Sequence, residues 1–156
     1  MRKAFFRTLL EHFIMENRMS ERNEFNQRVV DEFRANQGKV GGQMASIPLM
    51  LLTTTGAKTG RALTKPLAYT SDGDRIFVIA SFAGSQHDPA WFVNLVANPT
   101  VTVELGSERY QARARVTTGE ERQRLFNVQA EKLPIFHDYQ KKTTRQIPVV
   151  VFERLS

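Results

Sequence analysis

The chain contains no cysteine among its 156 residues. This absence excludes disulfide bonds, thiol nucleophiles, iron–sulfur clusters and zinc sites that use cysteine ligands. Long hydrophobic runs are also missing, since no apolar stretch reaches the ~18 residues that a membrane-spanning helix requires. The N-terminus lacks the apolar core and small-residue cleavage site of a secretory signal. We therefore expect a soluble, unprocessed protein in the cytoplasm.

Acidic residues are absent from the whole segment between Phe33 and Ser71. The basic residues of that segment are Arg34, Lys39, Lys58, Arg61 and Lys65. At its centre, in the sequence LLTTTGAKTGRALTKPLAY, an apolar strand leads through a basic turn bracketed by glycines into a second strand. Cations without nearby counter-charges raise the local positive potential, so this turn is a candidate site for a phosphate or a carboxylate. The alternative is an ordinary solvated basic loop.

The whole chain is also basic, with a formal net charge of +6. This charge favours acidic partners, namely nucleic acid, an anionic membrane surface or a polyanionic small molecule. A surface that stacks nucleic-acid bases needs exposed aromatic rings. Most of the 11 Phe fall instead at apolar positions of the predicted strands and helices. We therefore expect them in the core and expect no nucleic-acid partner.

Several catalytic patterns are missing from the chain. Ala57 stands where the P-loop requires a glycine before its lysine, and no GxGxxG dinucleotide fingerprint occurs. His12, His87 and His137 lack the paired spacing of metal ligands, and no GxSxG nucleophile elbow accompanies them. We expect no metal. Redox chemistry by a bound cofactor needs fewer side chains, because the protein then supplies binding, orientation and electrostatics.

Residues 1–18 combine large apolar residues at helical spacing with basic residues near the start. The apolar residues are Phe5, Phe6, Leu9, Leu10, Phe13 and Ile14, and the basic ones are Arg2, Lys3 and Arg7. Such an amphipathic helix can contact the inner face of the cell membrane, pack onto the domain, or be a start-site extension. Residues 19–156 are predicted to form a single domain, large enough to remove roughly 70% of its unfolded surface from water.

A second helix is predicted over residues 22–37, with Gly38 as its stop. Its apolar face would carry Phe25, Val29, Val30 and Phe33. Extended segments then follow at 48–54, 64–70, 75–80, 100–105, 108–116 and 147–153. Hairpins are predicted to join 64–70 with 75–80, and 100–105 with 108–116 around Gly106-Ser107.

Helices are predicted between these strands. One begins with Asp88 as N-cap and Pro89 at its first position, and ends at Asn98-Pro99. Another starts at a capping box of Thr117 and Glu120 and runs to about residue 132, and a shorter one covers 135–143. Strands joined by short turns favour antiparallel pairing, and about six of them curl into a barrel. The predicted fold class is α+β, a small antiparallel β-barrel with helices packed on the outside.

Four motifs occur in order along the chain, namely GAKTGR, KPLAY, DPAWFVNLVANP and RQIPVVVFE. Through them, residues 21–153 resemble the deazaflavin-dependent nitroreductases, an actinobacterial family of split-barrel reductases that use reduced coenzyme F-420. The resemblance implies a split β-barrel without a metal. It also implies an oxidoreductase that transfers a hydride from the deazaflavin to an apolar electrophile, such as a quinone or a nitro compound.

The resemblance further implies which residues bind the cofactor. A phosphate-binding turn would be formed by Lys58, Thr59, Gly60 and Arg61. The rest of the cofactor would contact Lys65, Pro66, Ala80, Ser81, Trp91 and Asn94. Without the resemblance, a lone tryptophan such as Trp91 is more often a core anchor.

The resemblance places the electrophile beside Ala68, Leu133, Phe136 and Tyr139. The hydroxyl groups of Ser81 and Tyr139 would serve catalysis by donating to an oxygen of the acceptor. Nitroimidazole-activating members place several tyrosines at the substrate, and here only Tyr139 matches, so a more apolar quinone is the expected acceptor. We expect a monomer. The rival functions are an FMN-binding split-barrel reductase and a non-catalytic basic module that binds a membrane or nucleic acid.

Overall fold

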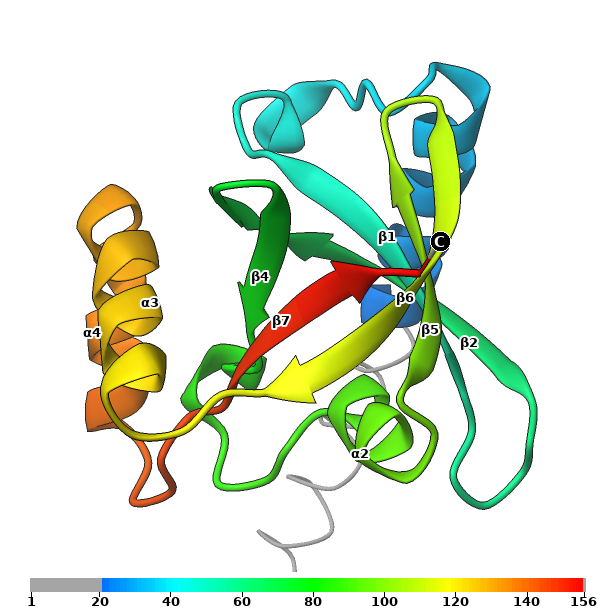
Figure 1. Ribbon diagram of the computed structural model, residues 1–156. Coiled ribbons are helices and arrows are strands. Elements are labelled where there is room, and N and C mark those ends of the chain that lie inside the picture. Colours follow the sequence, from blue (N-terminus) through cyan, green and yellow to red (C-terminus); the bar gives the residue numbers. More distant parts are fainter. Residues whose placement is uncertain (1–20, 156) are drawn as a thin grey trace, which may run out of the picture.

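The computed structural model describes residues 21–155. Its centre is an antiparallel sheet of seven strands in the order β2-β1-β5-β6-β7-β4-β3 (Figure 1). The strands are β1 (Leu49–Thr55), β2 (Ala62–Ala68), β3 (Thr70–Asp72), β4 (Arg75–Ile79), β5 (Thr100–Leu105), β6 (Glu108–Val116) and β7 (Val149–Arg154). The helices are residues 21–35, α2 (Ala90–Ala97), α3 (Gly119–Lys132) and α4 (Ile135–Lys141), with short 3-10 turns η1 (Gly42–Met44) and η2 (Phe82–Gly84).

The curl of the sheet follows from one extended segment that changes partners. β2 and β3 are consecutive in the chain but lie at opposite ends of the strand order. Residues 62–68 pair with β1, whereas residues 70–72 pair with β4. Because this segment bridges the two edges of the sheet, the sheet closes into a split barrel, as predicted. The predicted hairpin of 64–70 with 75–80 is wrong for residues 64–68, which pair with β1 instead.

Three strands, β1, β4 and β7, are hydrophobic on both faces. Successive side chains of a strand point to opposite faces of the sheet. The inward side chains of these strands are Met50, Leu52, Ile76, Val78, Val150 and Phe152. The outward ones are Leu49, Leu51, Phe77, Ile79, Val149 and Val151. The outward residues of β1 pack against helix 21–35, and those of β4 and β7 against α3 and α4 (Figure 1). Helices therefore cover the outside of the barrel.

Helix 21–35 ends two residues earlier than predicted, and Gly38 stops it as expected. Gly38 has a φ of 90°, and its N–H donates to the carbonyl of Phe33 at 2.8 Å. A Cβ at this position would lie 2.6 Å from the Cα of Gly106, so only glycine fits here. The expectation for Phe25 is wrong, because its side chain is 43% exposed, with Arg28 of the same helix over its ring.

The predicted N-cap of α2 is wrong. Pro89 occupies the N-cap position, and no side chain caps the helix. The carboxylate of Asp88 instead accepts a hydrogen bond from Arg145 at 3.0 Å. Asp88 therefore forms an ion pair with Arg145, which is distant in the sequence, instead of capping the start of α2.

The predicted capping box of α3 is also wrong. The N-cap residue is Thr118, one residue later, and it makes no side-chain cap. The hydroxyl of Thr117 donates to the carbonyl of Val149 at 2.8 Å, which ties the end of β6 to β7. The helix itself ends at Lys132, as predicted.

The remaining elements agree closely with the predictions. The hairpin of β5 and β6 has the predicted bounds, whereas α4 ends two residues early and β7 is shifted toward the C-terminus. The predicted helix over residues 1–18, with its membrane contact, lies outside the described residues. Within residues 21–155, no helix has the length and apolar character needed to cross a membrane.

Candidate functional site

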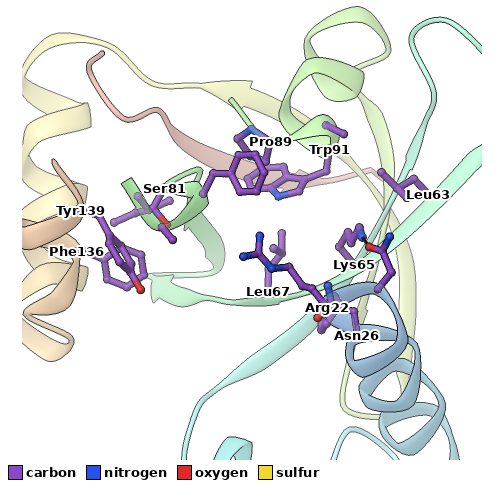
Figure 2. A pocket seen from close by; sticks show the side chains of 16 residues that line it. Arg22, Asn26, Leu63, Lys65, Leu67, Ser81, Pro89, Trp91, Phe136 and Tyr139 are labelled. Atoms are coloured by element: carbon purple, nitrogen blue, oxygen red, sulfur yellow. Dashed lines mark hydrogen bonds between the residues drawn. The ribbon is translucent and has the colours of Figure 1, made fainter. Parts of the chain in front are cut away.

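A cavity of about 530 Å³ opens beside the barrel, between helix 21–35, β2, the segment that follows β4, the start of α2, and α4 (Figure 2). Its volume lies within the ~300–1,000 Å³ typical of small-molecule sites. Lining residues that the sequence had indicated are Lys65, Pro66, Ser81, Trp91, Phe136 and Tyr139. The fold thus brings together side chains from distant parts of the chain.

Strand β2 forms one wall of the cavity. Pro66 has no N–H to donate to a neighbouring strand, which suits β2 because it lies at one end of the strand order. Beside it, the Lys65 ammonium donates to Asn23 Oδ1 of helix 21–35 at 3.3 Å. Burial, together with the nearby charge of Arg22, lowers the pKa of Lys65. No carboxylate among residues 21–155 forms an ion pair with this ammonium.

The segment that carries Ser81 adopts a strained backbone. Phe82 and Ala83 have φ values of 44° and 53°, in the left-handed region that residues other than glycine rarely adopt. Such strain costs on the order of 1–3 kcal/mol per residue and persists only where the surroundings hold it. Phe82 and Ala83 both line the cavity, so the strained backbone shapes the wall next to Ser81.

Arg145 holds this strained segment in place. Its Nε donates to the carbonyl of Ser85 at 2.8 Å, its Nη1 to that of Ala80 at 3.2 Å, and its Nη2 to that of Ser81 at 2.8 Å. Its Nη1 also pairs with Asp88 at 3.0 Å. The sequence reasoning missed this role, because the partners lie 57 to 65 positions away and leave no local pattern.

The opposite wall is aromatic. Phe136 and Tyr139 lie three residues apart on α4, and their rings pack edge to face with centroids 5.7 Å apart. Figure 2 shows both rings on the same side of the cavity as Ser81. Within residues 21–155, neither the Ser81 Oγ nor the Tyr139 hydroxyl has a hydrogen-bond partner. Both hydroxyl groups are therefore available to a ligand.

Trp91 lies between the core and the cavity. It is 6% exposed and belongs to the hydrophobic cluster inside the barrel, and it also lines the cavity. Asn94, one turn later, does not line the cavity. Its Oδ1 accepts from the N–H of Ala57 at 3.0 Å and its Nδ2 donates to Thr54 Oγ1 at 3.2 Å. Asn94 thus fastens α2 to the basic turn.

The basic turn between β1 and β2 is exposed and closed by its own hydrogen bonds. Gly56 N–H donates to the Arg61 carbonyl at 2.7 Å, and Gly60 N–H donates to the Gly56 carbonyl at 2.9 Å. Among residues 21–155, no protein atom accepts the N–H of Lys58 or Thr59. The turn therefore presents two cations and two backbone donors, and β2 leads directly from it to the cavity.

The other predicted site residues lie outside the cavity lining. Ala68 pairs with Leu49 in the sheet, and Leu133 packs on the cluster beneath α3 and α4. Ala80 is wholly buried and belongs to the hydrophobic cluster inside the barrel. The turn residues Lys58, Thr59, Gly60 and Arg61 adjoin β2 but do not line the cavity.

Arg22, Asn23 and Asn26 also line the cavity, and the sequence reasoning missed them. The sequence pattern does indicate Arg22 and Asn26, because they lie at helical spacing on the same face as the buried Val29 and Phe33. Polar residues on such a face indicate that the helix faces a ligand cavity there instead of the core. Elsewhere in the described chain, no group of three or more His, Asp or Glu side chains could hold a metal ion.

Comparison with known proteins gives consistent matches. Residues 25–154 match the family described as F420H(2)-dependent quinone reductase. A quinone reductase of this description from Mycobacterium tuberculosis is 36% identical over 126 residues, which cover 78% of this chain and 85% of the relative.

Two solved structures are similar in both sequence and fold. One is described as an F420-H2 dependent reductase and is 38% identical, with a TM-score of 0.63 over 68% of this chain and 94% of its own. The other is described as a domain-swapped dimer and is 36% identical, with a TM-score of 0.65 over 81% of this chain and 96% of its own.

Proposed function

Because the chain belongs to the F420H(2)-dependent quinone reductase family, we propose that it is an oxidoreductase that transfers a hydride from reduced coenzyme F-420 to a quinone. The observation that carries the proposal is that β2 connects a cationic turn with the cavity. An exposed cationic turn precedes the strand, and an aromatic cavity of about 530 Å³ lies along it. This arrangement suits a flat ring that carries an anionic tail.

The residues of the turn fit the anionic part of the cofactor. Lys58 and Arg61 supply charge, and the N–H groups of Lys58 and Thr59 have no acceptor among residues 21–155. A Cβ on Gly60 would meet nothing within 4 Å, so open space lies above the turn at this position. Asn94 positions the turn through its hydrogen bond to Ala57.

The cavity fits the ring of the cofactor and the acceptor. We assign the ring to the surface of Lys65, Pro66 and Trp91, with Ala80 and Ser81 at its border. When bound, the reduced deazaflavin supplies the hydride. We assign the acceptor to the wall of Phe136 and Tyr139. Ala68 and Leu133, which the resemblance placed beside the acceptor, lie outside the lining.

Ser81 and Tyr139 would act on the oxygen of the quinone. A quinone that receives a hydride gains two electrons and one hydrogen, which leaves a hydroquinone anion. Hydrogen bonds from the two hydroxyl groups would stabilise the negative charge that develops on this oxygen. A proton from solvent, passed through either hydroxyl, completes the hydroquinone.

Titration of the purified protein with coenzyme F-420, followed by cofactor fluorescence, tests the proposal. Lys58→Ala and Arg61→Ala should each weaken the affinity roughly 10- to 150-fold, as expected when a charge-assisted hydrogen bond of ~1.5–3 kcal/mol is lost. Lys39→Ala is the matched control, because Lys39 is exposed and lies in the same acid-free segment but outside the turn and the cavity. Binding no tighter than the millimolar range, or equal losses in all three variants, would refute the proposal.

We also propose that the protein works as a monomer in the cytoplasm and contacts the inner face of the membrane through residues 1–18. The basic, amphipathic pattern of this segment supports the contact, since such helices lie on anionic lipid surfaces. Co-sedimentation with anionic liposomes, with and without residues 1–18, tests it. Equal binding of the full and shortened chains would contradict the assignment.

A further inference from the structure

One wall of the cavity comes from helix 21–35. Arg22, Asn23 and Asn26 line the cavity from this helix, yet the family match begins only at residue 25. Arg22 and Asn23 therefore lie just before the residues that match the family. Figure 2 shows Arg22 reaching from the helix into the cavity, opposite Trp91.

The Arg22 side chain is held over the strained segment on the other side of the cavity. The Cζ of its guanidinium lies 6.0 Å from the centroid of the Phe82 ring, a distance at which a cation is attracted to an aromatic face. Its neighbour Asn23 accepts the hydrogen bond from Lys65. The helix and β2 thus place two cations at one cavity.

Among residues 21–155, no protein group balances the charge of the cavity. In the part of the chain that the structure describes, no Asp or Glu lines it. Within residues 21–155, no carboxylate forms an ion pair with Arg22 or Lys65. Two like charges on a partly buried surface repel each other, and an anionic ligand between them would remove this repulsion. The remaining walls are apolar and aromatic.

We propose that the acceptor is an aromatic compound with an anionic oxygen, and that Arg22 and the ammonium of Lys65 bind this oxygen while the acceptor ring lies against Phe136, beside the deazaflavin ring assigned to Pro66 and Trp91. This inference rests on the proposed function where it calls the ligand an electron acceptor. Ionised hydroxyquinones and quinone carboxylates belong to this chemical class. The proposed function assigns the anionic part of the cofactor to the turn of Lys58 and Arg61, which leaves the cations Arg22 and Lys65 to select the acceptor.

The first test needs no cofactor. Trp91 is the only tryptophan of the chain and lines the cavity, so its fluorescence reports ligand binding there. The probes are 2-hydroxy-1,4-naphthoquinone, which is ionised at neutral pH, and the neutral 2-methoxy-1,4-naphthoquinone. We expect the full chain to prefer the anion. Arg22→Met should weaken binding of the anion roughly 10-fold and leave binding of the neutral quinone essentially unchanged.

Arg28→Met is the matched control, because Arg28 is an exposed arginine on the same helix outside the cavity. The Arg28→Met variant should retain the preference for the anionic quinone. The Arg22→Lys variant keeps the positive charge and should retain most of this preference. Equal binding of the two quinones by the unaltered chain would overturn the inference. Equal weakening by Arg22→Met and Arg28→Met would overturn it as well, because only the net charge would then matter.

Titration of Arg22→Met with coenzyme F-420 separates this inference from the proposed function. We expect unchanged cofactor affinity. A roughly 10-fold loss with no change in the preference for the anionic quinone would assign Arg22 to the cofactor and overturn the inference. If the unaltered chain fails to bind the cofactor, the proposed function fails, whereas the naphthoquinone titrations still decide whether the cavity selects an anion.

Discussion

Arg145→Met should destabilise the protein strongly, because it removes the side chain that holds the segment from Ala80 to Asp88. Four hydrogen bonds join Arg145 to this segment, and its side chain is only 15% exposed. Methionine keeps the apolar stem but supplies no donor. The substitution therefore tests the hydrogen bonds more than the packing.

The expected loss of unfolding free energy follows from the three hydrogen bonds that Arg145 donates to backbone carbonyls. At ~1.5–3 kcal/mol each, their sum has an upper bound of about 4.5–9 kcal/mol. Water can replace the guanidinium at Ser81 and Ser85, which are half-buried, but not readily at Ala80, which is wholly buried. Relaxation of the strained Phe82 and Ala83 offsets part of the loss. We expect a net decrease of about 3–5 kcal/mol in the free energy of unfolding.

Urea denaturation followed by Trp91 fluorescence measures this loss. In a thermal scan, the same loss should lower Tm by roughly 6–20 °C for a chain of this size. Arg154→Met is the control, since Arg154 forms an exposed ion pair with Glu108 that contributes at most about 1 kcal/mol. If the two variants differ by less than about 1 kcal/mol, Arg145 does not hold the segment and the reasoning is wrong.

Two further predictions concern a glycine and a carboxylate. Gly84→Ala should cost about 2–4 kcal/mol in urea denaturation, because its φ is +80° and a Cβ would lie 2.8 Å from the carbonyl oxygen of Tyr139. Gly73→Ala, with a φ of +67° and open space around the Cβ, should cost only the ~1–2 kcal/mol of the left-handed backbone. The hydrogen bond from Arg115 is the main cause that lowers the pKa of Glu121 from 4.5 to about 2. Because the folded-state pKa is the lower one, this stabilisation is present above about pH 4.5 and is lost as the pH falls toward 2. Glu121→Gln should therefore be less stable than the unaltered chain at neutral pH, with a gap that narrows in acid.

Features that depend on neighbouring residues could be predicted from the sequence. The hairpin of β5 and β6 was predicted with its bounds, because the alternation of apolar residues and the Gly106-Ser107 turn are both local. Gly38 was recognised as a helix stop for the same reason. The partner of β2 was not predicted, because the choice between β1 and β4 depends on how the whole sheet closes.

The same distinction between local and distant features applies to the residues of the candidate site. Residues within motifs, such as Lys65 and Trp91, were indicated by the family resemblance and do line the cavity. Arg145 was not indicated, because its role depends on a segment about 60 positions away in the chain. The predicted caps at Asp88 and Thr117 failed because each side chain has a tertiary partner that competes with the local cap.

The segment without acidic residues, between Phe33 and Ser71, shows that the charge of a site depends on which residues meet in the fold and not on their order in the sequence. Arg34 belongs to this segment but pairs with Glu104 of β5 at 2.9 Å, so it adds little to the potential of the site. Arg22 lies outside the segment, yet it enters the cavity beside Lys65 and reinforces its charge. The cations at the cavity therefore come from two parts of the chain that meet only in the fold. An anion selected by this pair would depend on Arg22 of helix 21–35, which precedes the family match, as much as on β2.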